Sequence, residues 1–215
     1  MFGIVRVFIG CILLCCIVIF VRKSNIGHKR AFYFFSPILV MFTTALLFLV
    51  PAENLFITFS SPQDAYEYIS YGKPHIELIV EGNSSDFIVD QQNGSSVYQI
   101  IPKTANGWKI GIGTDTKKVF QRFSDGISMD VYQFKNTNDY YITLLDINGG
   151  ELTISDCYNS QFHSIEQTNE VVNKTFVTYY AHISDFSSEY FLTINGAAFR
   201  VAEGQEDGSV VPLLP

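Results

Sequence analysis

The first 50 residues are almost entirely apolar. Residues 2–21 contain a single charge, Arg6, and residues 31–50 contain none. About 20 helical residues, each rising about 1.5 Å, are needed to cross the roughly 30 Å hydrocarbon layer of a membrane. Buried helices of soluble proteins are usually shorter and keep a polar stripe, which neither run has. The pattern therefore predicts two transmembrane helices, at 2–21 and 31–50.

A cleavable signal peptide is the alternative interpretation of the first run. Arg6 supplies a basic start, and the Gly10-Cys11 pair resembles the small residues of a cleavage site. The apolar stretch before Cys11 is short, however, and the apolar run continues for ten residues beyond it. We therefore expect a membrane span rather than a cleaved leader.

A basic loop, residues 22–30, separates the two runs. It carries four cations, which are Arg22, Lys23, Lys29 and Arg30, whereas residues 51–72 carry no Lys or Arg. Short loops rich in Lys and Arg stay in the cytoplasm. The charges therefore predict a multi-pass protein of the cell membrane, with its N-terminus outside, the basic loop inside and the chain after residue 50 outside.

After an exit linker at 51–60, the sequence predicts one helix. Ser61 can accept a hydrogen bond at the N-cap, and Pro62 suits the first helical position. Asp64 falls in the first turn, where a carboxylate meets free amides and the positive end of the helix dipole. We expect a helix from Pro62 to about Ser70.

From residue 75 onward, apolar and polar residues alternate. This pattern predicts strands at 75–81, 86–90, 96–102, 108–110, 128–135, 139–146, 151–155, 175–183, 190–194 and 197–202. Asn-Gly pairs, which supply the positive φ of tight hairpin turns, begin at Asn93, Asn106, Asn148 and Asn195. The region 61–203 therefore reads as a mainly β domain, an antiparallel sandwich or a half-open barrel, followed by a loose tail at 204–215.

The charge is distributed unevenly. All 21 Asp and Glu residues lie at or beyond Glu53, against nine Lys and Arg residues in the same region, a net charge of −12 there. A domain this acidic lacks the positively charged surface that binds nucleic acid, and it is repelled by anionic lipid. The simplest role of the charge is to keep the domain soluble.

Cysteine usage agrees with this organisation. Only Cys157 lies beyond the apolar runs, so no disulfide can form within the domain. At this size a domain can bury a core without one. The absence of disulfides fits a bacterial cell-surface protein.

Three short motifs carry a resemblance. They are Ser61-Pro62-Gln63-Asp64-Ala65-Tyr66, the stretch IIPKTANGWKI at 100–110, and Asn138-Asp139-Tyr140-Tyr141. Together with the two apolar runs, they resemble a group of uncharacterised small membrane-anchored proteins of Gram-positive bacteria. The resemblance implies a surface-exposed domain on a membrane anchor, and it brings no activity or catalytic residues.

No motif predicts a catalytic, cofactor or metal site. Cys157 with His163 or His182 is the only Cys/His set beyond the spans, and His75 has no partner at a metal-binding spacing. Residues 146–151 hold three oxygen-bearing side chains around glycines, a fragment of a calcium loop that we interpret as a hairpin turn. Glycosylation sequons begin at Asn83, Asn93 and Asn173 and matter only in a eukaryotic secretory pathway.

Two classes of function remain. The first is a non-enzymatic membrane-anchored domain outside the cytoplasm that binds or assists an envelope or membrane partner, either a protein or an envelope polymer. The alternative is a cell-envelope hydrolase whose site gathers scattered acidic and His residues. A pocket that brings His163, His182 or Cys157 to carboxylates would favour the hydrolase.

Overall fold

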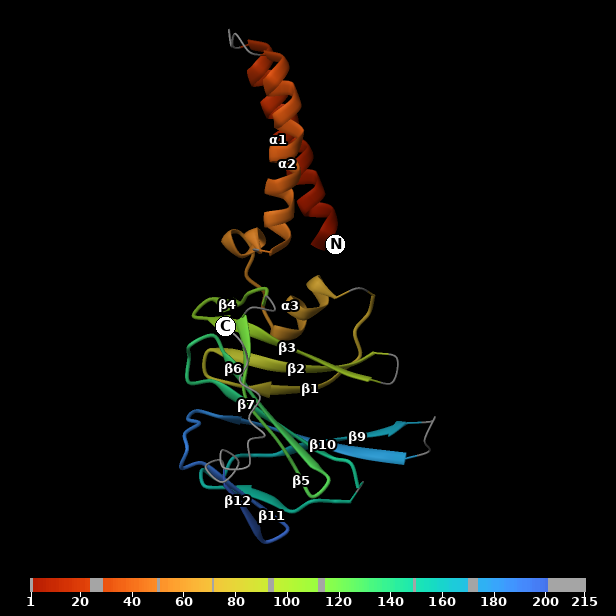
Figure 1. Cartoon of the computed structure of the whole chain (residues 1–215), viewed down its shortest axis with the longest axis vertical. Coiled ribbons are helices and arrows are strands. Elements are labelled where there is room, and N and C mark those ends of the chain that lie inside the picture. The colour runs from red at the N-terminus through yellow and green to blue at the C-terminus, as the bar shows by residue number, and fades with distance from the viewer. Residues whose placement is uncertain are drawn as a thin grey trace.

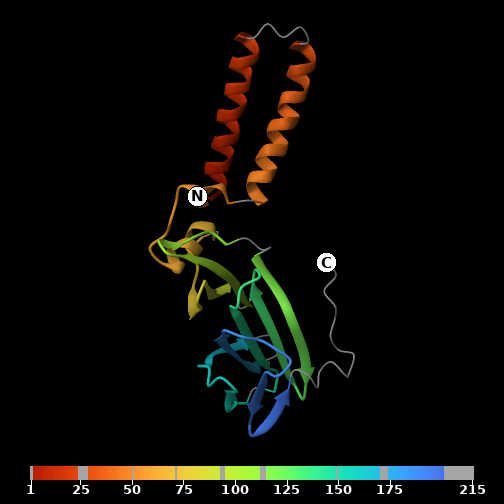
Figure 2. The ribbon, with the colours of Figure 1, turned by 90° about the vertical axis from the view of Figure 1, so that its left-hand side faces the viewer.

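The computed structural model describes residues 2–23, 29–49, 51–70, 72–92, 95–111, 115–148, 150–169 and 174–200. Two long helices stand at one end of the molecule, and a β-rich domain forms the other end (Figures 1 and 2). Among the residues described in full, no helix is long and apolar enough to cross a membrane. The expected tail at 204–215 lies outside the described residues.

Helices α1 (Phe2–Lys23) and α2 (Lys29–Leu49) lie side by side as an antiparallel pair (Figure 2). The expected basic loop at 22–30 is shorter than predicted, because both helices extend into it. Arg22 and Lys23 form the last turn of α1, where cations are stabilised by the negative end of the helix dipole. Lys29 begins α2, and residues 24–28 between them lie outside the described residues.

The expected exit linker at 51–60 is attached to the β domain. It contains a short 3₁₀ helix, η1 (Ala52–Leu55). The Asn54 side chain donates to the Ile110 carbonyl at 2.9 Å and accepts from the Ile110 amide at 2.8 Å. The Lys109 ammonium donates to the carbonyls of Asn54 at 2.9 Å and Ile57 at 2.7 Å. These hydrogen bonds fix the segment around Asn54 and Ile57 to the β domain.

Helix α3 (Pro62–Ile69) follows and begins as the sequence predicts. The Asp64 amide donates to the Ser61 hydroxyl at 3.0 Å, and Pro62 occupies the first turn. Ala65 and Tyr66 are buried on the face that meets the first sheet. The short helix is thus held by its cap and by its apolar face.

The described residues form three antiparallel sheets. The strands are β1 (Ile76–Glu81), β2 (Ser85–Gln92), β3 (Ser95–Thr104), β4 (Gly107–Trp108), β5 (Thr116–Ser124), β6 (Ile127–Phe134), β7 (Tyr140–Asp146), β8 (Ile154–Asp156), β9 (His163–Asn169), β10 (Lys174–Ile183), β11 (Phe191–Ile194) and β12 (Ala197–Arg200). Their orders are β1-β2-β3-β4, β5-β6-β7-β10-β9 and β12-β11-β8.

The five-stranded sheet lies between the other two. One of its faces packs against β11 through a core that includes Met129, Ile142 and Leu144. The other face presents aromatic side chains, Tyr132, Tyr141 and Tyr180 among them, to the four-stranded sheet. The outer face of the four-stranded sheet is covered by α3. Side chains of β2 and β3 alternate between the two cores of the four-stranded sheet, and those of β6, β7 and β10 alternate between the two cores of the five-stranded sheet, with the period of two that is typical of strands.

The predicted mainly β, antiparallel domain is confirmed, with two corrections. The expected single sandwich or half-open barrel is instead a stack of three sheets. The Asn148-Gly149 pair does not join a hairpin, because β7 and β8 belong to different sheets. The pairs at 93–94 and 195–196 come between paired strands in the sequence, and residues 93–94 lie outside the described residues. Asn106 immediately precedes β4, which begins at Gly107 and pairs with β3. At the β11–β12 turn, Asn195 and Gly196 have φ values of 50° and 82°, as such a turn requires.

Phe87 gives a direct test of the packing between the four- and five-stranded sheets. It is 1% exposed, and its ring centroid lies 5.1 Å from that of Tyr141 and 5.4 Å from that of Tyr98. Phe87→Ala is expected to lower the free energy of unfolding by about 3–5 kcal/mol, because it leaves a cavity in this core.

Phe123→Ala is the matched control, since Phe123 is 61% exposed. It should change the same free energy by about 0.5 kcal/mol or less. Urea unfolding can be followed by the fluorescence of the single tryptophan, Trp108. Equal losses from the two variants would contradict the assignment of Phe87 to the core.

Candidate functional site

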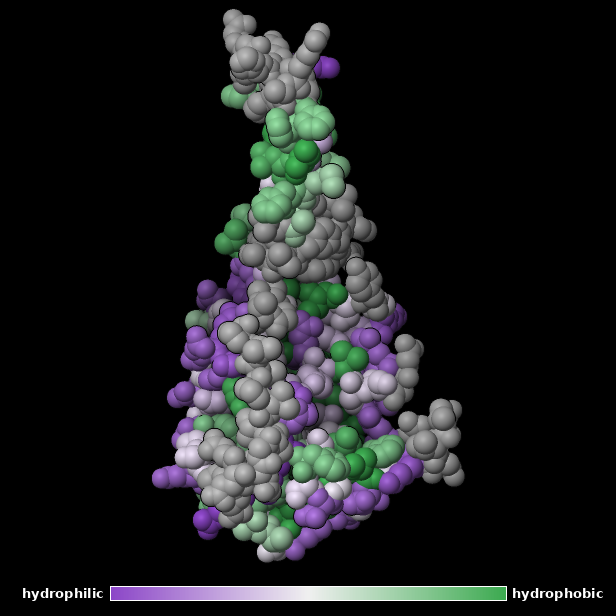
Figure 3. Space-filling view, viewed as in Figure 1, coloured by the Kyte–Doolittle hydropathy of each residue, from purple (hydrophilic) through white to green (hydrophobic). Residues whose placement is uncertain are grey.

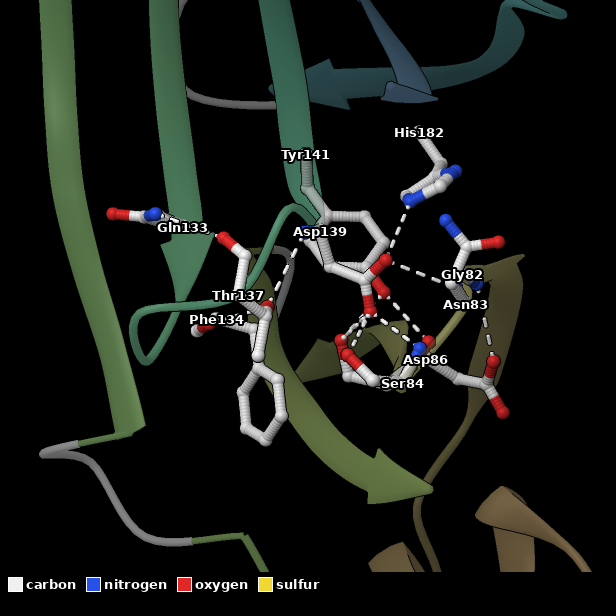
Figure 4. A network of polar contacts seen from close by, with 11 residues as sticks. Gly82, Asn83, Ser84, Asp86, Gln133, Phe134, Thr137, Asp139, Tyr141 and His182 are labelled. Atoms are coloured by element: carbon white, nitrogen blue, oxygen red, sulfur yellow. Dashed lines mark hydrogen bonds and ion pairs between the residues drawn. The ribbon is translucent and has the colours of Figure 1, made fainter. Parts of the chain in front are cut away.

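A network of polar contacts gathers around Asp139, immediately before β7 (Figure 4). The Asp139 carboxylate is 1% exposed and accepts hydrogen bonds from the amides of Asn83 at 2.9 Å and Ser84 at 2.6 Å. The hydroxyls of Ser84 and Ser85 donate to it at 2.7 and 3.0 Å. Nε2 of His182, on β10, lies 2.9 Å from its Oδ1. One carboxylate therefore connects the β1–β2 turn to two strands of the five-stranded sheet.

The turn that meets Asp139 is shaped by Gly82. Its amide donates to the Ser85 carbonyl at 2.9 Å, and the Tyr141 hydroxyl donates to the same carbonyl at 2.7 Å. A Cβ at position 82 would overlap the Tyr141 hydroxyl and the Ser85 carbonyl. Glycine is therefore required where the turn closes against β7.

The electrostatics of the network keep Asp139 ionised. Burial acts to raise the pKa of this carboxyl, but the hydrogen bonds from His182, Ser84 and Asn83 outweigh it and hold the pKa below its usual range. Burial raises the pKa of the neighbouring Tyr141 hydroxyl, which stays protonated as a donor. The cluster is thus a fixed acceptor surrounded by donors.

The Ser, His and Asp residues of this network do not form a catalytic triad. In a triad the nucleophilic hydroxyl is hydrogen-bonded to the base. Here the hydroxyls of Ser84 and Ser85 donate to Asp139, and the described contacts of His182 do not include a serine hydroxyl. The geometry is that of a structural connection.

The other residues of the predicted Cys/His set lie apart from it. Cys157 packs against the core shared with β11, whereas His182 contacts Tyr141 on the opposite face of the central sheet. His163 pairs with Tyr180 across β9 and β10, and His75 is exposed. Within the described ranges, no group of three or more His, Cys, Asp or Glu residues is arranged to hold a metal ion.

The structure contains a cavity of about 570 Å³. Strands β11 and β12, which contribute to its lining, lie at the end of the β domain that is remote from α1 and α2 (Figure 1). The cavity is formed by the β5–β6 turn, the β7–β8 loop and the β11–β12 hairpin. The residues that line it are Arg122, Ser124, Asp125, Ile127, Asp146, Asn148, Gly150, Glu151, Leu152, Ile194, Asn195, Ala197, Ala198 and Phe199. Its volume is in the range of small-ligand pockets, about 300–1,000 Å³.

Hydrogen bonds tie the three loops of the cavity together. The Asp146 carboxylate accepts from the amides of Asn148 at 2.8 Å and Gly150 at 2.7 Å. The Asn148 side chain donates to the Asp125 carbonyl at 3.2 Å, and the Asn195 side chain accepts from the Thr153 amide at 2.9 Å. Asp146, the first residue of the calcium-loop fragment, thus uses both its oxygens to hold the loop.

Arg122 is the cation of the cavity. Its Nη1 donates to the Arg200 carbonyl at 2.9 Å, and its Cζ lies 4.0 Å from the centroid of the Phe199 ring. The stacked guanidinium is therefore fixed in position. The exposed Asp125 and Glu151 lie on the same cavity, so it offers ligands both signs of charge beside apolar side chains.

Sequence patterns located only part of these two sites. The sequence singles out Asn148 and Asn195 as turn residues, but it does not predict the strand that carries Arg122.

The topology residues Arg22 and Lys23 are exposed at the end of α1, and the side chains of Lys29 and Arg30 lie outside the described residues. Asn83 is exposed beside the Asp139 network, and the sequons at Asn93 and Asn173 fall outside the described residues.

Comparison with known proteins adds no assignment to either site. The chain matches no protein-family model, no curated protein and no solved structure.

Asp139→Asn tests the network. An amide in place of the carboxylate directs an N–H group at surrounding donors, so we expect the free energy of unfolding at pH 7 to fall by about 3 kcal/mol or more. The free energy of unfolding of the variant should also depend less steeply on pH in the acid range. Because the folded-state pKa is lowered, the stabilisation by Asp139 is present above the unfolded pKa of about 3.9 and is lost as the pH falls below it.

Urea unfolding between pH 7 and pH 2.5 measures both effects. Asp185→Asn, at an exposed position, is the control and should leave the profile almost unchanged. If Asp139→Asn kept the full acid-side slope of the unsubstituted chain, the assignment would be wrong.

Proposed function

We propose that this chain is a membrane-anchored, non-enzymatic binding domain displayed outside the cytoplasm. In this proposal α1 and α2 cross the bilayer, and the cavity at the far end of the β domain binds an envelope partner. No cofactor is required. The membership suggested by the short motifs, a group of membrane-anchored surface proteins, stays a prediction.

The observation that carries the anchor is the apolar surface of the two helices. Large hydrophobic side chains face outward, with exposed fractions of 66% for Phe8, 63% for Phe20, 70% for Phe34 and 73% for Met41. Figure 3 shows this green surface on the described part of the helices and a largely hydrophilic β domain below it. Apolar patches of this kind mark membrane or protein contacts. The 20-residue apolar runs at 2–21 and 31–50 favour the membrane.

The charges at the helix ends support the orientation. Arg22 and Lys23 lie at the end of the helix pair that is remote from the β domain (Figure 2). Lys29 and Arg30 begin α2 at the same end. If these four cations stay in the cytoplasm, as such clusters do, the β domain lies on the opposite side.

The attached linker supports a role in presentation. Hydrogen bonds from Asn54 and Lys109 fix the chain after α2 to the domain. In the proposed topology the cavity lies at the end of the domain that is remote from the bilayer (Figure 1). The net negative charge of the domain repels it from anionic lipid.

Cysteine labelling on intact cells tests the topology. In a background without the four native cysteines, Glu189→Cys, at an exposed position of the β domain, should react with a membrane-impermeant maleimide. Ser24→Cys, between the helices, should react only after lysis. The reverse pattern would overturn the proposed orientation, and labelling of both sites on intact cells would overturn the two-span anchor.

Site-specific photo-crosslinking tests the cavity. A photoreactive residue at Ala198, on the cavity rim, should give a defined adduct in intact cells, whereas one at exposed Lys73 near α3 should not. Gly150→Trp should remove the adduct by filling the cavity, since a Cβ there has only the Asp146 carboxylate nearby, at 3.5 Å. Equal adducts from Ala198 and Lys73, or adducts that survive Gly150→Trp, would count against binding in the cavity.

A further inference from the structure

The outer strands of the three sheets differ in how they are protected. Strands β1 and β5 each carry an irregularity in their pairing, and β5 adds Lys117 and Lys118. Strands β4, β8 and β12 have two, three and four residues. Bulges, lysines and shortness are the usual devices that keep a sheet edge from pairing with another chain.

Strand β9 has none of these devices. It pairs with β10 over seven residues without a shift in register, and 163–169 contain no Lys, Arg or Pro. It is the last strand of its sheet, and the described backbone hydrogen bonds of β9 all go to β10. Figure 1 shows the β9–β10 pair at one side of the domain. One row of β9 amides and carbonyls is therefore available for another strand.

Two side chains of β9 are fixed by contacts with the rest of the β domain. The partly buried Ile165 packs against the aromatic core between the four- and five-stranded sheets. The Gln167 side chain donates to the Ser96 hydroxyl of β3. These contacts fix β9 in an extended conformation before any partner arrives, which reduces the entropy lost on binding.

We propose that β9 binds an extended, basic segment of a partner protein, which adds a strand to the edge of the five-stranded sheet. Backbone hydrogen bonds supply the affinity in this mode, and alternate side chains supply the specificity. This binding surface is separate from the cavity and does not depend on the proposed membrane topology.

The charge of the partner follows from Glu166. It lies at the centre of β9, with Ser164 and Thr168 on the same exposed face. Residues directly opposite on adjacent strands have Cβ atoms about 4.5–5.5 Å apart, where opposite charges attract. A Lys or Arg opposite Glu166 fits this position, with β-branched residues beside it. The net charge of −12 after Pro51 also attracts a basic segment.

The same residue disfavours a second copy of this chain. An antiparallel pair of β9 strands in full overlap would place Glu166 opposite the Glu166 of the other copy. Like charges directly opposite each other destabilise a sheet. A different, basic chain is therefore the better match to this edge.

The test uses the full chain in nanodiscs of neutral lipid and the peptide Lys-Thr-Val-Lys-Val-Thr-Lys with blocked ends. Binding is measured by fluorescence anisotropy of the labelled peptide. Glu166→Lys should weaken binding about tenfold, the sum of one attraction lost and one repulsion gained. Glu189→Lys, an equal change of net charge at another exposed site, should weaken it about twofold or less.

Two further readouts separate strand addition from charge attraction. The outward amides of β9 should gain protection from hydrogen exchange when the peptide binds. A peptide of equal charge with Pro in place of both Val residues should bind at least about tenfold more weakly, because proline lacks the donor and disfavours the strand.

Several outcomes would overturn the proposal. They are no binding to the unsubstituted chain, equal effects of the two lysine variants, equal binding of the proline peptide, and binding without protection of β9. Protection of β9 in the absence of peptide, together with dimerisation by light scattering, would assign the edge to a second copy instead.

Discussion

The Asp139 carboxylate is the constraint on which the relative position of the two larger sheets depends. The aromatic core around Phe87 supplies the apolar burial between them, but such contacts are non-directional and tolerate sliding. Hydrogen bonds from the 83–85 turn and from His182 have fixed directions, and they join segments more than 40 residues apart in the sequence. In a domain with one cysteine, this buried anion takes the place that a disulfide holds in many small secreted domains.

The same chemistry recurs at two other buried aspartates and explains how an acidic domain buries carboxylates. Asp146 accepts two backbone amides of its own loop. Asp156 accepts from the Ser160 amide at 2.8 Å and from the Tyr190 hydroxyl at 2.9 Å. A buried charge is costly unless it is hydrogen-bonded, and these donors meet that requirement without a cation. Two lysines do pair with acids: Lys118 with the partly exposed Asp130, and the more exposed Lys135 with the buried Asp115.

Local patterns predicted most strands and few of the contacts between them. Ten of the twelve described strands overlap runs that the sequence predicts as strands, but β5 and β9 do not. The Lys117-Lys118 pair and the following bulge interrupt the alternation of β5, and β9 has Ile165 as its one aliphatic residue. The Asp139 network and the cavity could not be predicted, because each is assembled from turns that are distant in the sequence. The pairing of such turns depends on sheet order, which hairpin signals do not specify.

The arrangement of the domain gives these features different spatial roles. Hydrogen bonds between Asn54 and residues 109–110 fix the segment that follows α2 beside β4, at one edge of the four-stranded sheet. Asp139 fixes the five-stranded sheet relative to the four-stranded sheet. The core shared with β11 fixes the cavity relative to the five-stranded sheet. Such a chain of fixed contacts suits a domain that presents surfaces in set directions: the cavity at the remote end and the β9 edge at the side. A partner bound at either proposed surface would therefore be held in a fixed orientation relative to the segment around Asn54 and Ile57 that follows α2.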